Sequence, residues 1–190
     1  MDVRAVAFDL DGTITKTSVR FAPFRKRIGC GEGDVLDYVG KAGVEDMKRF
    51  YGILDEYERK IQEDCTLNPG FSELLYFLNE RKIKTGIVTR SSREHARIVT
   101  KKLGIPIRHI IAREDAEPKP SGKPLIMLSK MLESPTEKML FVGDFLWDML
   151  AGRNAGVKTV LLVNEHSKRF EHLADYRVNK LDEIIRIIEG

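Results

Sequence analysis

The sequence has little of several features that would point to particular classes of protein. It contains two cysteines, Cys30 and Cys65, and a single tryptophan among 190 residues. Without paired spacing or companion histidines, the cysteines argue against a zinc site, and a disulfide between them stays open. No apolar run is long enough to cross a bilayer, and residues 1–4 lead into an apolar strand rather than a signal peptide. These absences predict a cytoplasmic protein without a membrane partner.

The chain also lacks an excess of charge of one sign. Its 32 basic and 29 acidic residues are interspersed and give a net charge of +3 with a pI near 8.8. A nucleic-acid partner would favour a basic stripe, so none is expected. The one local basic excess includes Arg20 and Arg25. These two side chains belong either to a solvated helix face or to a site that recognises the far end of an anionic substrate.

What is present is a regular alternation of apolar strands and amphipathic helices. The pattern predicts strands at residues 3–8, 84–88, 107–111, 138–142 and 157–163, and helices at 70–81, 91–103, 125–132, 146–154 and 181–189. Strands that alternate with helices are typical of an α/β protein. We therefore expect a doubly wound, mostly parallel, Rossmann-like sheet.

Residues 16–67 break this alternation. They carry glycine breakers at 29–33 and 40–43, and their charged and apolar residues recur at helical spacing over 47–61. The break predicts a small all-helical domain inserted after the first strand. The core domain would then comprise residues 1–15 and 68–190.

The first strand ends in an unusual hexapeptide, Phe-Asp-Leu-Asp-Gly-Thr, at residues 8–13. Asp9 and Asp11 stand one residue apart, and a turn at Gly12 would let their carboxylates diverge around one spot. Two acids at the end of a buried strand repel each other and lose hydration unless a divalent cation or a shared proton lies between them. An ordinary Asp-Gly turn would give the same short pattern.

Three further motifs follow the ends of predicted strands. Thr89 could help to hold an anion at a helix start, or it could simply cap that helix. Lys119 stands between two prolines that would fix its backbone, although a rigid linker would look similar. Asp144 and Asp148 follow the fourth strand one helical turn apart, and helix capping by Asp144 would explain only one of them. The four histidines show no ligand spacing and are interpreted as surface or packing residues: His95, His109, His166 and His172.

Together these motifs resemble the haloacid dehalogenase-like phosphohydrolases, in particular the phosphoglycolate-phosphatase-like branch, whose helical cap lies between the first and second motifs. The resemblance spans almost the whole chain. The first motif is the hexapeptide, the second centres on Thr89, the third on Lys119 and the fourth on Asp144 with Asp148. Residues 68–71 and 151–156 also look like flanks found in that branch.

The resemblance implies an Mg²⁺-dependent phosphomonoesterase that works through an aspartyl-phosphate. Asp9 would be the nucleophile and Asp11 the general acid and base. Mg²⁺ would be held by Asp9, the backbone carbonyl of Asp11 and Asp144, with Asp148 supporting the metal or anchoring Lys119. The remaining expected site residues would bind the phosphoryl oxygens through side chains or backbone N–H groups: Leu10, Asp11, Thr89, Arg90 and Lys119.

The implied substrate is a small phosphorylated metabolite, with phosphoglycolate favoured. Alternatives are a broad-range sugar-phosphate or nucleotide phosphatase, a phosphomutase and a non-catalytic phosphate-binding domain. Two positions depart from the family pattern. Arg90 replaces a frequent Asn and could bind a phosphate or a carboxylate, or point to solvent. Phe145 stands where a small polar residue is frequent, which would leave the metal's surroundings poorer in hydroxyls. The oligomeric state, monomer or homodimer, stays open.

Overall fold

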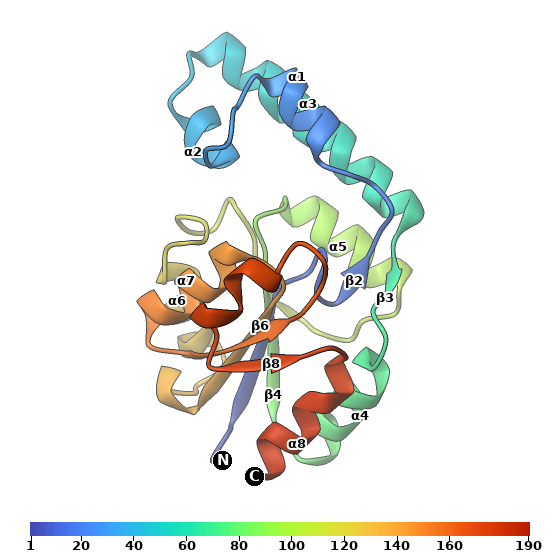
Figure 1. Ribbon diagram of the computed structural model, residues 1–190, viewed down its shortest axis with the longest axis vertical. Helices are drawn as coiled ribbons and strands as arrows, with labels where there is room; N and C mark the ends of the chain where they lie inside the picture. Colours follow the sequence, from blue (N-terminus) through green and yellow to red (C-terminus); the bar gives the residue numbers. More distant parts are fainter. The chain divides into compact units, whose positions relative to one another are not determined.

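The computed structural model describes all 190 residues and divides the chain into two compact units. The sheet unit comprises Met1–Lys16 and Thr66–Gly190, and the helical unit comprises Thr17–Cys65 (Figure 1). The helical unit starts one residue later and ends two residues earlier than the predicted insertion at 16–67.

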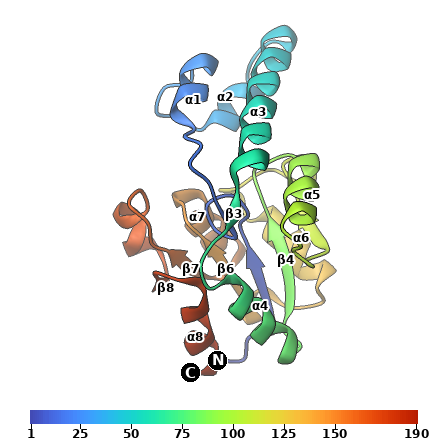
Figure 2. The ribbon, with the colours of Figure 1, turned by 90° about the vertical axis from the view of Figure 1, so that its right-hand side faces the viewer.

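The sheet unit is built on six parallel strands in the order β5-β4-β1-β6-β7-β8 (Figures 1 and 2). The strands are β1 (Ala5–Phe8), β4 (Lys84–Val88), β5 (His109–Ile111), β6 (Met139–Gly143), β7 (Lys158–Leu162) and β8 (Tyr176–Val178). Every residue of β1 and β6 is buried, as expected for central strands that are covered on both faces.

Helices cover both faces of this sheet. They are α4 (Phe71–Glu80), α5 (Arg93–Lys102), α6 (Lys123–Met131), α7 (Leu146–Ala155) and α8 (Ile184–Glu189). Ala5 and Ala7 of β1 pack with residues of α6 and α7, whereas Phe8 points to the other face, where the centres of the Phe8 and Phe71 rings lie 5.8 Å apart. None of the helices has the length and apolarity that spanning a membrane requires.

The strand order places β1 at a topological switch point. The chain runs from β1 outward through β4 and β5, then returns to the other side of β1 for β6, β7 and β8. In open α/β sheets, ligands bind at the carboxyl ends of the strands beside such a point. The predicted doubly wound, Rossmann-like fold is confirmed, and its switch point coincides with the strand that carries Asp9 and Asp11.

Several elements differ from the sequence-based prediction. The strand β8 was not predicted, because three residues are too few to show a clear alternation. A two-stranded antiparallel pair, β2 (Thr15–Lys16) with β3 (Thr66–Leu67), was also missed. The helix α6 begins at Lys123, inside the predicted loop 118–124, because Pro124 suits the first turn of a helix.

Three short 3₁₀ helices complete the sheet unit: Thr136–Lys138, Lys168–Leu173 and Leu181–Glu183. The last one, together with α8, replaces the single closing helix that was predicted at 181–189. The helix α5, which was predicted from residue 91, begins at Arg93. The N-cap is Ser92, whose side chain accepts a hydrogen bond from the backbone N–H of His95.

The helical unit contains α1 (Ala22–Ile28), α2 (Val35–Gly40) and α3 (Val44–Asp64). Phe24, Val39 and Phe50, one from each helix, belong to a small apolar core of its own. The side chain of Asp34 accepts hydrogen bonds from Leu36 and Asp37 and so caps α2. The predicted helical segment at 47–61 is the middle of the longer α3.

Candidate active site

The loop after β1 positions the first pair of acids. The backbone N–H of Asp9 donates to Val142 of β6 at 2.8 Å, which extends the sheet by one residue. Gly12 then adopts a φ of +97°, and a Cβ at this position would lie 2.6 Å from Oδ2 of Asp144. Only glycine fits both the backbone and the space. The turn therefore brings the end of β1 against the end of β6.

Asn68, which the sequence analysis did not assign to the site, secures this turn. Its Nδ2 donates to the carbonyl oxygens of Gly12 at 3.0 Å and Thr13 at 2.7 Å. The residue lies just after β3, more than fifty positions away in the chain. No local pattern reveals such a contact, because an Asn before a Pro-Gly pair is typical of any turn.

Lys119 lies at the centre of the acidic cluster. Its side chain is 2% exposed, and its Nζ lies 2.5 Å from Oδ1 of Asp9, 2.6 Å from Oδ1 of Asp148 and 2.9 Å from the carbonyl oxygen of Val88. Burial alone would lower the pKa of Lys119, but Asp148 and Asp9 outweigh it and raise the pKa. The lysine is therefore a fixed, buried cation beside Asp9.

Burial raises the pKa of Asp9 well above its ordinary value, and the charges of Asp148 and Asp144 act in the same direction. Lys119 opposes this shift. Additional positive charge beside Asp9 would therefore favour its ionised form further.

Asp144 is the second acid of the cluster whose pKa is raised. Burial, followed by the charge of Asp148, raises its pKa to about 7, although Lys119, Asn164 and Thr13 act against the shift. Nδ2 of Asn164 donates to Oδ2 at 3.0 Å, and the hydroxyl of Thr13 donates to Oδ1 at 3.3 Å. Asn164 follows β7 and was not predicted.

Asp148, rather than Asp144, caps α7. Its Oδ2 accepts a hydrogen bond from the backbone N–H of Phe145 at 3.0 Å, while its Oδ1 binds Lys119. The alternative in which Asp144 caps the helix therefore does not hold. The carboxylate of Asp148 joins the start of α7 to the buried lysine.

The cluster has the donors that a hard divalent cation requires. Carboxylate oxygens of Asp9, Asp144 and Asp148 lie within 4.8 Å of one another. Magnesium prefers oxygen ligands and is commonly bound through one or two carboxylates. A cation here would relieve the repulsion that raises the pKa values of Asp9 and Asp144, so the donor set fits.

Two of the predicted phosphate-binding residues, Thr89 and Arg90, have different contacts. Thr89 is buried; its hydroxyl accepts from the N–H of Ser91 at 3.0 Å, and its own N–H donates to Ile111. This hydroxyl therefore shapes the turn that precedes α5. Its role is close to the alternative in which Thr89 caps that helix. The guanidinium of Arg90 donates to the carbonyl oxygen of Lys119 and lies 5.6 Å from the ring centre of Trp147.

Asp11 has two partners that connect it to the start of α5. The hydroxyl of Ser91 donates to Oδ2 at 2.7 Å, and Nε2 of His95 lies 3.0 Å from Oδ1. His95 is fully buried, in agreement with its interpretation as a packing residue, but that interpretation did not include a contact with Asp11. The contact joins residues 84 positions apart, so local spacing could not reveal it.

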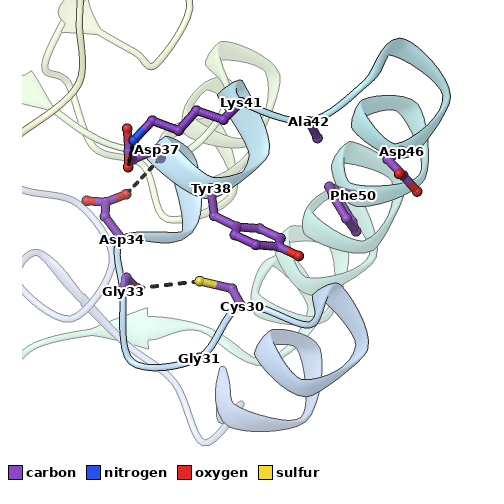
Figure 3. Close-up of a pocket in the computed structure, with 10 residues that line it drawn as sticks. All are labelled: Cys30, Gly31, Gly33, Asp34, Asp37, Tyr38, Lys41, Ala42, Asp46 and Phe50. Carbon is purple, nitrogen blue, oxygen red and sulfur yellow. Dashed lines mark hydrogen bonds and ion pairs between the residues drawn. The ribbon is translucent and has the colours of Figure 1, made fainter.

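The helical unit has a separate cavity of about 550 Å³ (Figure 3). Its lining includes Cys30, Asp37 and Lys41, and the last two form an ion pair at 2.7 Å. Beside it, NH1 of Arg25 donates to the carbonyl oxygens of Gly31 at 2.5 Å and Gly33 at 2.7 Å. Arg25 thus secures the loop between α1 and α2, a role that neither earlier interpretation included.

The two other open questions in this unit have simple structural answers. Arg20 is exposed, as in the solvated alternative, but it precedes α1 rather than lying on a helix face. Cys30 and Cys65 are both buried and are not joined to each other, so the disulfide that the sequence left open is not formed.

A parallel sheet with buried acids and a lysine at its switch point defines an α/β enzyme of the phosphoryl-transfer type. The family model described as haloacid dehalogenase-like hydrolase matches residues 3–156. The chain belongs to this family, as its motifs predicted. It is an enzyme, a hydrolase of the phosphatase type, and that prediction is confirmed at this level.

Relatives and a solved structure agree with this assignment. A protein of Caldanaerobacter subterraneus named "Putative pyrophosphatase PpaX" is 32% identical over 100% of this chain and 96% of its own. An N-acetylmuramic acid 6-phosphate phosphatase of Pseudomonas putida is 28% identical over 84% of this chain and 82% of its own. The crystal structure of a hydrolase from Pseudomonas syringae covers 98% of both chains with a TM-score of 0.80 and 24% identity, which shows the shared fold.

Proposed function

We propose that the protein hydrolyses phosphomonoesters of small metabolites with the help of Mg²⁺ and through an aspartyl-phosphate. The observation that carries the proposal is the buried cluster at the switch point, in which Lys119 contacts both Asp9 and Asp148 while Asp144 lies beside them. A cluster of three acids around one lysine is costly to bury, so its presence at a ligand-binding edge favours a catalytic role.

Asp9 is the proposed nucleophile. An oxygen of its carboxylate attacks phosphorus, the bond from phosphorus to the leaving oxygen breaks, and the phosphoryl group is transferred to Asp9. Lys119 keeps this carboxylate in place at 2.5 Å and favours its ionised form. The lysine also supplies a fixed positive charge for the phosphoryl oxygens as negative charge develops on them.

Asp9, the backbone carbonyl of Asp11 and Asp144 are the proposed ligands of Mg²⁺, with Asp148 as their support. When bound, the ion supplies positive charge that neutralises the phosphoryl oxygens and the acids. Asn164 and Thr13 fix both oxygens of Asp144, which keeps its carboxylate oriented toward the cluster.

Asp11 is the proposed general acid and base. It gives its proton to the leaving oxygen when the first bond breaks, and it takes a proton from the water that releases phosphate from Asp9. Backbone N–H groups near Leu10, Asp11 and Arg90 are proposed to bind the phosphoryl oxygens with Lys119. Thr89 contributes by shaping this turn, and the guanidinium of Arg90 stabilises the loop of Lys119.

Phosphoglycolate remains the first substrate to test, as the family resemblance implies. Pyrophosphate is the second, because a relative of nearly the same length carries a pyrophosphatase name. A sugar phosphate is the third, in line with the relative that is named for N-acetylmuramic acid 6-phosphate. We propose that the protein acts in the cytoplasm on such small molecules.

A phosphate-release screen over these three classes, with Mg²⁺ or with EDTA, tests the proposal. Asp9→Asn should lower turnover by at least about a thousandfold, because an amide cannot form the phosphoryl intermediate. The matched control is Asp2→Asn, the same change at an exposed acid that pairs with Lys138 at 2.6 Å, and it should leave turnover unchanged. Full activity in EDTA, or in Asp9→Asn, would contradict the mechanism.

The same screen separates the alternatives. A phosphomutase would isomerise a sugar phosphate and release little phosphate, and a non-catalytic domain would bind phosphate without turnover. A pyrophosphatase would prefer pyrophosphate over every phosphomonoester by at least about tenfold in kcat/KM.

A further inference from the structure

Two side chains from one turn of the chain contact both oxygens of Asp11. Ser91 Oγ donates to Oδ2 at 2.7 Å, and His95 Nε2 lies 3.0 Å from Oδ1. Asp11 itself is 18% exposed in its side chain, whereas the side chain of His95 is completely buried. The partly exposed carboxyl of Asp11 thus lies against the fully buried imidazole of His95.

The polarity of His95 calls for an explanation, because the neighbouring buried positions 96 and 99 of α5 are apolar. Ala96 and Val99 are fully buried on the same helix. Burying an imidazole costs free energy unless its nitrogen atoms find hydrogen-bond partners, and an apolar side chain would avoid that cost. The contact with Asp11 gives the imidazole a use that an apolar residue could not have.

We infer that His95 is a positioning residue for Asp11, which holds Oδ1 so that Oδ2 is the oxygen that carries the transferred proton. The inference rests on the proposed function of Asp11. A hydroxyl can donate or accept, so Ser91 can adjoin Oδ2 in either protonation state of the carboxyl. Nε2 of His95, as an N–H donor to Oδ1, fixes the side-chain rotamer of Asp11 in both states.

The consequence depends on the leaving group. In the first step the O–P bond of the substrate breaks, the electron pair stays on the leaving oxygen, and Asp11 protonates that oxygen. An alkyl phosphate leaves as a strongly basic alkoxide and needs the proton, whereas p-nitrophenolate is a weak base and leaves without it. A displaced Asp11 therefore slows this first step for alkyl phosphates and hardly affects it for p-nitrophenyl phosphate, whereas the later hydrolysis of phospho-Asp9 is the same step for both substrates.

The contact is tested by two amides of different length. Gln at position 95 can place an N–H near the position of Nε2, and Asn is too short to reach Oδ1. His95→Asn should lower kcat/KM, which reports the steps up to departure of the leaving group, by about 10- to 100-fold on the alkyl phosphate that the wild-type enzyme hydrolyses best. On p-nitrophenyl phosphate the loss in kcat/KM should stay below about threefold. His95→Gln should recover most of the lost kcat/KM.

Two reference variants separate positioning from general damage. Asp11→Asn should show the same dependence on the leaving group, and more strongly. Val99→Ala, which shortens a buried side chain one turn along α5, should lower the unfolding midpoint without any dependence on the leaving group. If His95→Asn does not fold, His95→Leu, which fills the buried space, takes its place.

Equal losses of kcat/KM on both substrates in the position-95 variants would show a merely structural role and overturn the inference. Unchanged kcat/KM would overturn it as well, because the contact would then have no role in the reaction. So would an increase, which would mean that His95 holds Asp11 away from the reaction. Failure of the proposed function looks different, because the wild-type protein would then release no phosphate from any substrate in Mg²⁺.

Discussion

At the scale of a single residue, the fold buries the carboxyl of Asp144 beside another acid, and both effects disfavour its ionised form. Its pKa of about 7 in the folded protein lies above the ordinary value of 3.8. Between these two pH values the folded protein retains a proton that the unfolded chain has lost. The contribution of this group to stability is therefore greatest below about pH 4 and decreases as the pH rises to 7, by up to about 4 kcal/mol.

We expect Asp144→Asn to be more stable than the wild-type protein in EDTA at pH 8, because the amide carries no charge that must be buried. The difference should shrink at pH 5, where the wild-type carboxyl is largely protonated. Urea unfolding at both pH values measures it. An equal difference at pH 5 and pH 8 would mean that the titration of Asp144 does not govern stability.

The same carboxyl predicts a metal effect of opposite sign. At pH 8, Mg²⁺ at about a hundred times its Kd should stabilise the wild-type protein by about 2.7 kcal/mol, because it binds the folded state alone. Asp144→Asn should lose most of this stabilisation, since a neutral amide is a weaker ligand. Thermal unfolding with Mg²⁺ and with EDTA tests this. The control is Asp175→Asn, an acid that pairs with Lys158 outside the cluster and should keep the full metal effect.

At the scale of an element, the turn between β1 and β2 depends on one glycine. Gly12→Ala would combine an unfavourable φ of +97° with a Cβ 2.6 Å from Asp144. We expect a loss of about 1–3 kcal/mol in the free energy of unfolding and at least a tenfold loss in kcat, because the turn must move away from the acids.

Replacing a matched glycine, Gly52, should have the opposite effect on stability. Gly52 lies in α3, is exposed, and a Cβ there would meet nothing within 4 Å. Gly52→Ala should raise stability by about 0.5–1 kcal/mol, because alanine restricts the unfolded chain and suits a helix. Chemical denaturation and phosphate release measure both variants. If Gly12→Ala behaves like Gly52→Ala, the turn is not tightly constrained.

Elements and site residues were predictable from the sequence to different degrees. The strands β1 and β6 are fully buried runs that are each followed by an aspartate, so both the strand and its functional end were visible. The strand β8 has three residues and depends on its pairing with β7, which is a tertiary property. Local pattern therefore predicts an element only when the element is long enough to show its period.

The same distinction separates the site residues. The family resemblance gave anchoring of Lys119 as one of two alternatives for Asp148, and the two side chains do lie 2.6 Å apart. In contrast, His95 and Asn164 contact the acids, and Asn68 contacts the turn at Gly12, from positions where a histidine or asparagine would usually cap a turn or face solvent. Their roles arise from long-range contacts, which one sequence without a structure does not reveal.

At the scale of the whole molecule, the helical unit is inserted into the sheet unit between two residues that pair with each other. Lys16 of β2 is opposite Thr66 of β3 in an antiparallel pair. Two strands in this arrangement can be joined by a two-residue turn such as Asn-Gly. Replacing Thr17–Cys65 with Asn-Gly should therefore leave a continuous chain that folds as the sheet unit.

The shortened chain should unfold cooperatively, be stabilised by Mg²⁺, and hydrolyse p-nitrophenyl phosphate within about tenfold of the full-length rate. The reason is that every residue of the acidic cluster, together with Ser91, His95 and Asn164, lies in Met1–Lys16 or Thr66–Gly190. Circular dichroism, thermal unfolding and phosphate release are the measurements, with Asp9→Asn in the shortened chain as the control for residual activity. A shortened chain that folds and binds Mg²⁺ but does not hydrolyse p-nitrophenyl phosphate would show that the helical unit contributes to the chemical step itself. A chain that does not fold would show that the sheet unit depends on the helical unit for stability.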